Sequence, residues 1–129
     1  MRILEIETFG RGGLIHYAFN LSCALAERGH PVTLLTTAAY ELADRSVPPN
    51  LHLVKGIARL TSRPRTRSSS RGLALGRSFE AVLDAFRVAA FARRLRPDVV
   101  HFHSTNNSAI AYLVLLRMSG IPVVTTAHV

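Results

Sequence analysis

Three segments of this chain pass from a helical pattern through Gly or Arg and then Pro into a β-branched, apolar run. They are residues 28–35, 95–100 and 119–124. Gly is favoured just beyond a helix C-terminus because it accepts a positive φ, and Pro cannot continue a helix, so each segment predicts a helix end followed by a strand. Alternating helices and strands are typical of βαβ units, which form parallel sheets buried on both faces. The sequence therefore predicts an α/β fold with helices on both faces of a parallel sheet.

Length and composition indicate one globular domain. The chain has 129 residues, of which 48% are hydrophobic, enough to form a core. Its single cysteine, Cys23, excludes an intramolecular disulfide and points to a reducing compartment. The first strand carries Glu5 and Glu7 rather than the apolar region of a signal peptide, and the longest apolar run, residues 109–116, is too short to span a bilayer. We expect a soluble, cytoplasmic protein.

Positive charge is concentrated in one segment. The formal net charge is +8, and seven cations, Lys55 and six arginines, lie in residues 55–77, where the sequence has no acid. The remainder is close to neutral, and no aromatic residue interrupts the arginines, so a nucleic-acid partner is not expected. Residues 61–72 contain no apolar side chain, which predicts a solvated, mobile loop over about 56–73. The alternative is contact with an anionic membrane through Arg63, Arg65, Arg67 and Arg71.

Hydrophobic periodicity predicts five strands and three helices. The strands are expected at 2–7, 32–36, 51–54, 99–102 and 123–127, and the helices at 14–28, at about 75–95 and after residue 107. In the second helix an apolar stripe at helical spacing is expected to face the core. It consists of Phe79, Val82, Leu83, Phe86 and Ala90, with Arg87 and Arg94 off the stripe. The third helix has little polar face and is expected to be largely buried.

The loop after the first strand is a candidate binding site, because parallel sheets bind ligands beyond the carboxyl ends of their strands. Residues 10–13, Gly-Arg-Gly-Gly, lie between that strand and the first helix. Backbone N–H groups and the positive helix end can meet an anion there. The loop is not a dinucleotide fingerprint, because Ile15 stands where the third glycine belongs, and no Gly-Lys-Ser/Thr follows to make a P-loop. A tight turn that binds nothing is an equal alternative.

Histidines mark the ends of the fourth and fifth strands. His101 and His103 share one side of a strand by its two-residue period, and His128 ends the neighbouring strand. A metal site is disfavoured, because no Cys, Asp or Glu joins them and His101 is expected inside the fold. We interpret His103 and His128 as hydrogen-bonding or acid–base groups facing the strand-end crevice. Residues 104–106 either extend this polar rim or cap the next helix.

Four motifs, taken in order, resemble the N-terminal domain of retaining GT-B glycosyltransferases of the family 4 type. They are Gly12-Gly13 at a helix start and residues 24–36, 96–104 and 120–128. The resemblance covers nearly the whole chain except residues 38–73. It implies a Rossmann-like half of a two-domain enzyme that transfers a sugar, of hexosyl type, from a nucleotide sugar to an acceptor. The N-terminal half would mainly hold the acceptor, and the C-terminal donor domain would be absent from residues 1–129.

The resemblance also implies roles for individual residues. Gly12 and Gly13 would let the first loop approach the donor phosphates, and His128 would be the catalytic-site histidine that contacts the transferred sugar. The acceptor side would be lined by His103, Ser104 and His16. The donor would be UDP- or GDP-linked, with no cofactor and no metal, because helix ends and basic side chains stabilise the departing phosphate in this fold.

Two functions from different classes follow from these observations. The first is sugar transfer by a full-length enzyme, of which residues 1–129 alone are expected to be inactive. The alternative is a non-catalytic acceptor- or membrane-binding subunit that pairs with a separate donor-binding chain. A nicotinamide-binding domain ranks third. The expected location is the cytoplasm, with peripheral contact at the inner face of the membrane as a variant.

Overall fold

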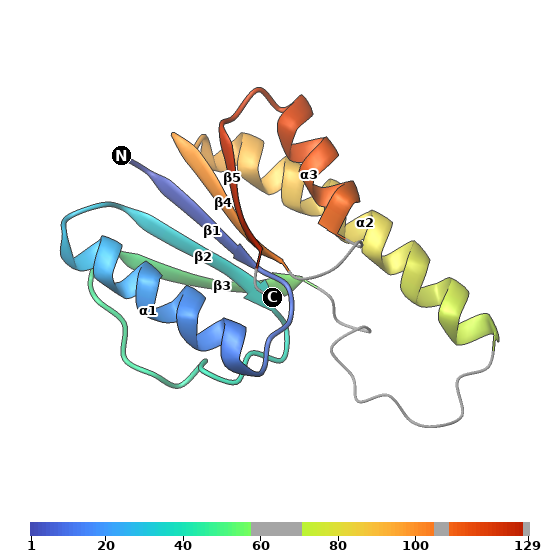
Figure 1. Cartoon of the computed structure of the whole chain (residues 1–129), viewed down its shortest axis with the longest axis horizontal. Coiled ribbons are helices and arrows are strands. Elements are labelled where there is room, and N and C mark those ends of the chain that lie inside the picture. Colours follow the sequence, from blue (N-terminus) through green and yellow to red (C-terminus); the bar gives the residue numbers. More distant parts are fainter. Residues whose placement is uncertain (58–70, 105–108, 128–129) are drawn as a thin grey trace.

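The computed structural model of the chain is a five-stranded parallel sheet with helices on both faces (Figure 1). It describes residues 1–57, 71–104 and 109–127. The elements, in chain order, are β1 (Ile3–Glu7), α1 (Gly13–Glu27), β2 (Val32–Thr37), β3 (Leu51–Ile57), α2 (Arg71–Leu95), β4 (Val99–Ser104), α3 (Ala109–Met118) and β5 (Val123–Ala127). The predicted α/β class and the alternation of strands with helices are confirmed.

The strand order creates a reversal next to the first strand. The sheet runs β3-β2-β1-β4-β5, and every neighbouring pair is parallel. The chain first adds β2 and β3 on one side of β1 and then returns to add β4 and β5 on the other. As a result α1 lies on one face of the sheet, and α2 and α3 lie on the opposite face (Figure 1). Doubly wound sheets bind ligands at such a reversal, beyond the carboxyl ends of the strands.

The three helix-to-strand junctions have the expected geometry. Gly29 and Gly120 have φ values of 87° and 74°, and Arg96 occupies the same left-handed region with a φ of 50°. The residues that follow join the sheet at once: Val100 N donates a hydrogen bond of 2.9 Å to the carbonyl of Pro122. Each junction therefore ends a helix and starts a parallel strand within a few residues.

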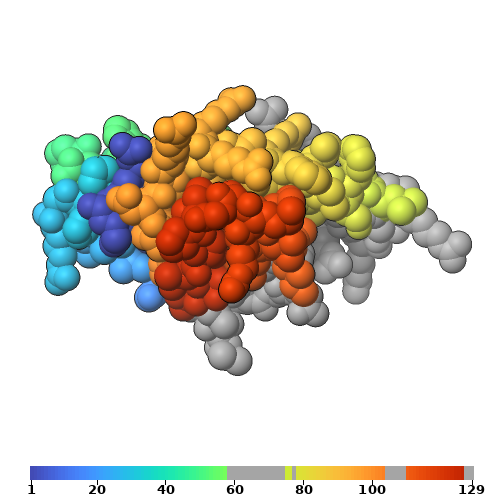
Figure 2. Space-filling view, turned by 90° about the horizontal axis from the view of Figure 1, so that it is seen from above, coloured from blue at the N-terminus to red at the C-terminus, as the bar shows by residue number. Residues whose placement is uncertain are grey.

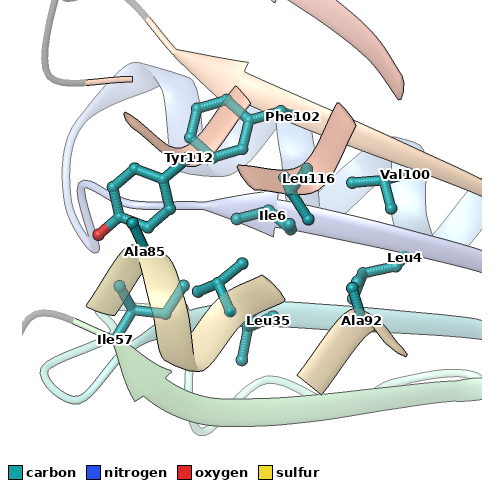
Figure 3. Packing of buried hydrophobic residues seen from close by; sticks show 11 residues of the cluster. Leu4, Ile6, Leu35, Ile57, Ala85, Ala92, Val100, Phe102, Tyr112 and Leu116 are labelled. Carbon is teal, nitrogen blue, oxygen red and sulfur yellow. The ribbon is translucent and has the colours of Figure 1, made fainter. Parts of the chain in front are cut away.

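The main core lies between the sheet and the pair of helices α2 and α3 (Figure 3). Its fully buried members include Leu4 and Ile6 of β1, Val100 and Phe102 of β4, Ala85 and Ala92 of α2, and Leu116 of α3. The rings of Phe102 and Tyr112 pack with their centroids 5.5 Å apart. A second apolar cluster beneath α1 contains Ile15 and Phe19. Both faces of the sheet are thus partly covered, as a parallel sheet requires.

The prediction for the inward face of α2 is wrong. Four members of the predicted stripe, Phe79, Val82, Leu83 and Phe86, are exposed by 66%, 49%, 38% and 58%, and Ala90 is exposed as well. The buried face carries small side chains instead: Ala85, Val88, Ala89 and Ala92. The helix has two apolar faces, and the face that packs against the core is the one with the smaller side chains. Periodicity alone cannot tell which apolar face is buried.

Two smaller expectations also change. In α3 Leu116 is buried, but Ile110, Val114 and Met118 are exposed, so this helix is only half covered. β3 extends through Ile57 and α2 begins at Arg71, so both ends of the predicted loop over about 56–73 belong to regular elements, and the rest of it, residues 58–70, lies outside the described residues. Four of its arginines, at 59, 63, 65 and 67, lie outside the described residues. Within the described part of the chain, no helix is both long and apolar enough to cross a membrane.

Candidate functional site

A buried carboxylate holds the Gly-rich loop after β1 in place. Glu7 accepts hydrogen bonds from the backbone N–H groups of Phe9 and Gly10, and from the hydroxyl of Thr36 at 3.0 Å. Burial raises the pKa of Glu7, and these hydrogen bonds oppose the rise. Gly10 is needed here, because its φ is 75° and a Cβ would collide with Thr37 Oγ1. The shape of the loop is therefore set by β1 and β2 beneath it.

The second half of the loop leaves the N-terminus of α1 open. Gly12 precedes the helix with φ 90° and ψ −173°, a conformation that is essentially restricted to glycine, and it provides no side-chain cap. The first turn of α1 contains no acid, so no residue of that turn compensates the positive end of the helix dipole. Apart from the adjacent residues and the nearby backbone of α1, no atom of the described residues lies within 4 Å of the positions that a Cβ on Gly12 or Gly13 would take. Another molecule can therefore approach this backbone closely.

A cavity of about 980 Å³ opens beside this helix end. Its lining includes residues 10–13, His16 from the first turns of α1, and Tyr40 and Glu41 from the segment after β2. Glu41 is exposed, and its carboxylate accepts a hydrogen bond of 3.3 Å from Gly12 N. The structure thus brings the predicted residues Gly12, Gly13 and His16 together. It adds Glu41, which no sequence pattern indicates because it lies in an irregular segment.

Below this edge, β1 and β4 bring a carboxylate and two imidazoles together. Glu5 pairs with His101 in the strand register, and Glu5 Oε2 lies 3.1 Å from His101 Nδ1 and 2.6 Å from His103 Nε2. His101 Nε2 in turn lies 2.7 Å from Thr126 Oγ1 of β5. Burial alone would raise the pKa of Glu5, but the hydrogen bonds and charges of both histidines together outweigh it and lower the pKa. The cluster ties three strands together through side chains.

This cluster corrects two sequence expectations. The prediction that no acid joins the histidines is wrong, because Glu5 does so through a strand pairing that the sequence does not display. His103 does not face the open crevice: it is fully buried, and its ring meets that of Tyr17 edge-on, with centroids 5.7 Å apart. Its assignment to the acceptor side stays a prediction.

The same three side chains are the described residues that could hold a metal ion. One ligand atom from each of Glu5, His101 and His103 lies within 4.8 Å of the others, and two histidines with one carboxylate form a set that Zn²⁺ accepts. In the structure, one nitrogen of each histidine points at the Glu5 carboxylate instead. A hydrogen-bonded cluster explains this geometry fully, and the prediction that no metal is required stays a prediction.

Comparison with known families agrees with this arrangement. The family model described as Glycosyltransferase Family 4 matches residues 11–129 of the chain. The chain belongs to this family. No curated protein sequence matches it significantly.

Solved structures of other glycosyltransferases have the same fold. MurG from Acinetobacter baumannii gives a TM-score of 0.62 at 19% identity, over 97% of this chain and 34% of MurG. Sucrose-phosphate synthase from Thermosynechococcus elongatus gives 0.63 at 18% identity, over 99% and 33%. Glycosyltransferase VinC, solved with dTDP, gives 0.61 at 17% identity, over 97% and 34%. The chain spans about a third of these proteins and has the Rossmann-like architecture of a GT-B N-terminal half.

In this glycosyltransferase domain, the predicted site residue Ser104 lies at the same edge of the sheet. Ser104 ends β4 and pairs with Ala127, the last residue of β5. Parallel strands end at one edge, so these positions share the edge of the Gly-rich loop. His128 follows β5 directly and lies outside the described residues, as do residues 105–106. The catalytic role of His128 and the acceptor-side role of Ser104 stay predictions.

Proposed function

We propose that this family 4 domain is the acceptor-side half of a retaining enzyme that transfers a hexosyl group from a UDP- or GDP-linked donor to an acceptor. The observation that carries the proposal is the open N-terminus of α1, where Gly12 and Gly13 present backbone to the cavity. A diphosphate is bound well by backbone N–H groups at the positive end of a helix. Both features occur here at the reversal of strand order, where this fold class binds ligands.

The start of α1 would act on the departing phosphate. As the bond between sugar and phosphate breaks, negative charge develops on the phosphate oxygen, and the helix end stabilises that charge without a metal ion. Gly12 N already donates to Glu41, so an arriving phosphate would take over that hydrogen bond. Two anions repel at such short range, and the exposed Glu41 side chain is free to turn toward solvent. His16 would meet the acceptor, and His128 would contact the transferred sugar.

The proposed enzyme requires a second domain. The chain spans about a third of the solved glycosyltransferases that it resembles. In the proposal the C-terminal half binds the donor nucleoside, and residues 1–129 in isolation bind acceptor without catalysis.

A substitution at Gly13 tests whether the donor approaches the backbone at the start of α1 closely. Its φ is not in the positive range, and the Cβ position is open among the described residues, so Gly13→Val introduces bulk into the cavity without backbone strain. In the full-length enzyme we expect the KM for the UDP- or GDP-hexose to rise roughly tenfold or more, because a displacement of about 1 Å is costly in such a site. Release of nucleoside diphosphate measures turnover, and urea denaturation checks the fold.

Gly76→Val is the matched control, because Gly76 is an exposed helical glycine in α2 with an equally open Cβ position. It is expected to leave the donor KM unchanged. Normal donor affinity in Gly13→Val would refute the assignment of the α1 N-terminus. Turnover that appears only after a separate donor-binding chain is added would support the subunit alternative.

A further inference from the structure

Helix α2 presents a continuous stripe of large apolar side chains to solvent. Its members are Leu75, Phe79, Val82, Leu83 and Phe86, exposed by 73%, 66%, 49%, 38% and 58%. Their spacing of three and four residues places them on one face of the helix. The opposite side of α2 already packs on the sheet, so the core does not account for this stripe. Contiguous exposed apolar side chains of this size mark an interaction surface.

The stripe lies where α2 leaves the body of the domain. Figure 1 shows the N-terminal half of the helix extending beyond the sheet and beyond α3. In Figure 2 the yellow atoms of α2 again project past the red atoms of α3 and β5. The N-terminal half of the stripe therefore lies on a part of α2 that projects from the rest of the described residues.

The charges on α2 favour an anionic partner. The two acids of the helix, Glu80 and Asp84, are buried at 8% and 2% exposure, so neither shares the stripe. Toward its C-terminus the stripe leads through Ala90 into Arg93 and Arg94, which follow at helical spacing and are both exposed. A helix with an exposed apolar face, no exposed acid and arginines beside that face is typical of segments that lie in the interface of an anionic bilayer.

We propose that α2 docks this domain on an anionic lipid bilayer. Phe79, Val82 and Phe86 enter the boundary between headgroups and acyl chains, and Arg93 and Arg94 contact lipid phosphates. The contact is peripheral, in line with the finding that no helix in the described part of the chain can cross a membrane. Membrane docking by α2 does not depend on the proposed sugar transfer. Only one consequence rests on that proposed function, namely that the acceptor is presented at the bilayer surface.

Vesicle flotation tests the proposal without donor or acceptor. The protein is expected to float with vesicles of phosphatidylcholine and phosphatidylglycerol and to bind pure phosphatidylcholine vesicles much less. The double variant Phe79→Ser/Phe86→Ser is expected to lower the partition coefficient by roughly tenfold or more, because two inserted rings are lost. Both positions are exposed, so the variant is expected to fold, which circular dichroism checks.

The control for the apolar face is Val124→Ser. Val124 is 52% exposed and pairs with His101, which places it on the face of the sheet opposite α2. A second pair of variants tests charge: Arg93→Gln/Arg94→Gln is expected to reduce the preference for anionic vesicles, and Arg45→Gln, an exposed arginine in the segment after β2, is expected not to.

The proposal is overturned if the wild-type protein does not float, if the double phenylalanine variant floats like wild type, or if Val124→Ser lowers binding equally. It is also overturned if the phenylalanine variant converts a dimer into a monomer in analytical ultracentrifugation while vesicle binding persists, because the stripe is then a protein interface. The two proposals are tested independently. A failure to bind vesicles would not contradict the proposed sugar transfer, and a normal donor affinity in Gly13→Val would not contradict membrane docking.

Discussion

Replacing Gly10 by Ala tests whether the Gly-rich loop owes its shape to packing against the end of β2 and the segment that follows it. Gly10 has a φ of 75°, and a Cβ there would overlap Thr37 Oγ1 and lie 2.9 Å from the carbonyl oxygen of Ala39. Gly120 has almost the same φ, 74°, but its Cβ position is open among the described residues. The two glycines share the conformational penalty and differ in the steric one.

The expected losses differ accordingly. A left-handed φ costs about 1–2 kcal/mol for a residue with a Cβ, so Gly120→Ala is expected to lower the free energy of unfolding by that amount. Overpacking adds about 1–3 kcal/mol, so Gly10→Ala is expected to lose about 2–5 kcal/mol. Urea denaturation followed by circular dichroism measures both values.

The same pair of variants also separates stability from function. The atoms that a Cβ at Gly10 meets belong to backbone and to a short side chain, so the loop itself must move, and donor affinity is expected to fall in Gly10→Ala but not in Gly120→Ala. Equal losses of stability in the two variants would refute the claim that packing shapes the loop. An unchanged donor affinity in Gly10→Ala would separate the loop from donor binding.

Two further predictions concern the buried cluster and the core. Glu5→Gln is expected to lower the free energy of unfolding at neutral pH by about 1.5–3 kcal/mol. Folding lowers the pKa of Glu5 below its ordinary value of 4.5, so its stabilisation is complete above that value and is lost as the pH falls through the lowered pKa. When stability is measured as a function of pH, Glu5→Gln is expected to lack this loss at acid pH. Glu27→Gln is the control, because it removes the same charge from the exposed end of α1. If the stability of Glu5→Gln fell as steeply at acid pH as that of the wild type, the role of the cluster would be contradicted. Leu116→Ala is expected to lower the free energy of unfolding, measured by urea denaturation, by about 2–5 kcal/mol, because Leu116 is buried. Val114→Ala, on the exposed side of α3, is expected to lower it by about 0.5 kcal/mol or less. Equal losses would show that α3 is oriented differently.

The fold class could be predicted because its signals are local. A glycine that ends a helix and a proline that starts a strand act within a few residues, and Gly29 and Gly120 have the positive φ that this reasoning requires. The orientation of α2 could not be predicted in the same way. Its stripe from Phe79 to Phe86 and its alanine face from Ala85 to Ala92 are both apolar, and which of them is buried depends on contacts with segments far away in the sequence.

The candidate site likewise contains residues that local sequence patterns predict and residues that they do not. Gly12, Gly13 and His16 are neighbours in sequence, so a strand-to-helix loop brings them to one cavity. Glu41 and Glu5 were missed as partners, because each depends on a contact between segments far apart in sequence. Strand pairing decides whether a side chain in β1 meets one in β4, and no local pattern encodes that register.

The first strand nevertheless carries a signal that sequence reasoning can use. β1 lies in the centre of the sheet, where ionised side chains are costly to bury, and yet it contains Glu5 and Glu7. Each carboxylate has its own set of donors: Glu5 bonds to the histidines of β4, and Glu7 bonds to the backbone of the Gly-rich loop. Two acids in a strand that is expected to be central and buried therefore predict partners from neighbouring segments. Here those partners are the loop that lines the cavity and the strand β4 beside β1, so the buried acids of β1 fix the loop that the proposed reaction needs and join β1 to β4.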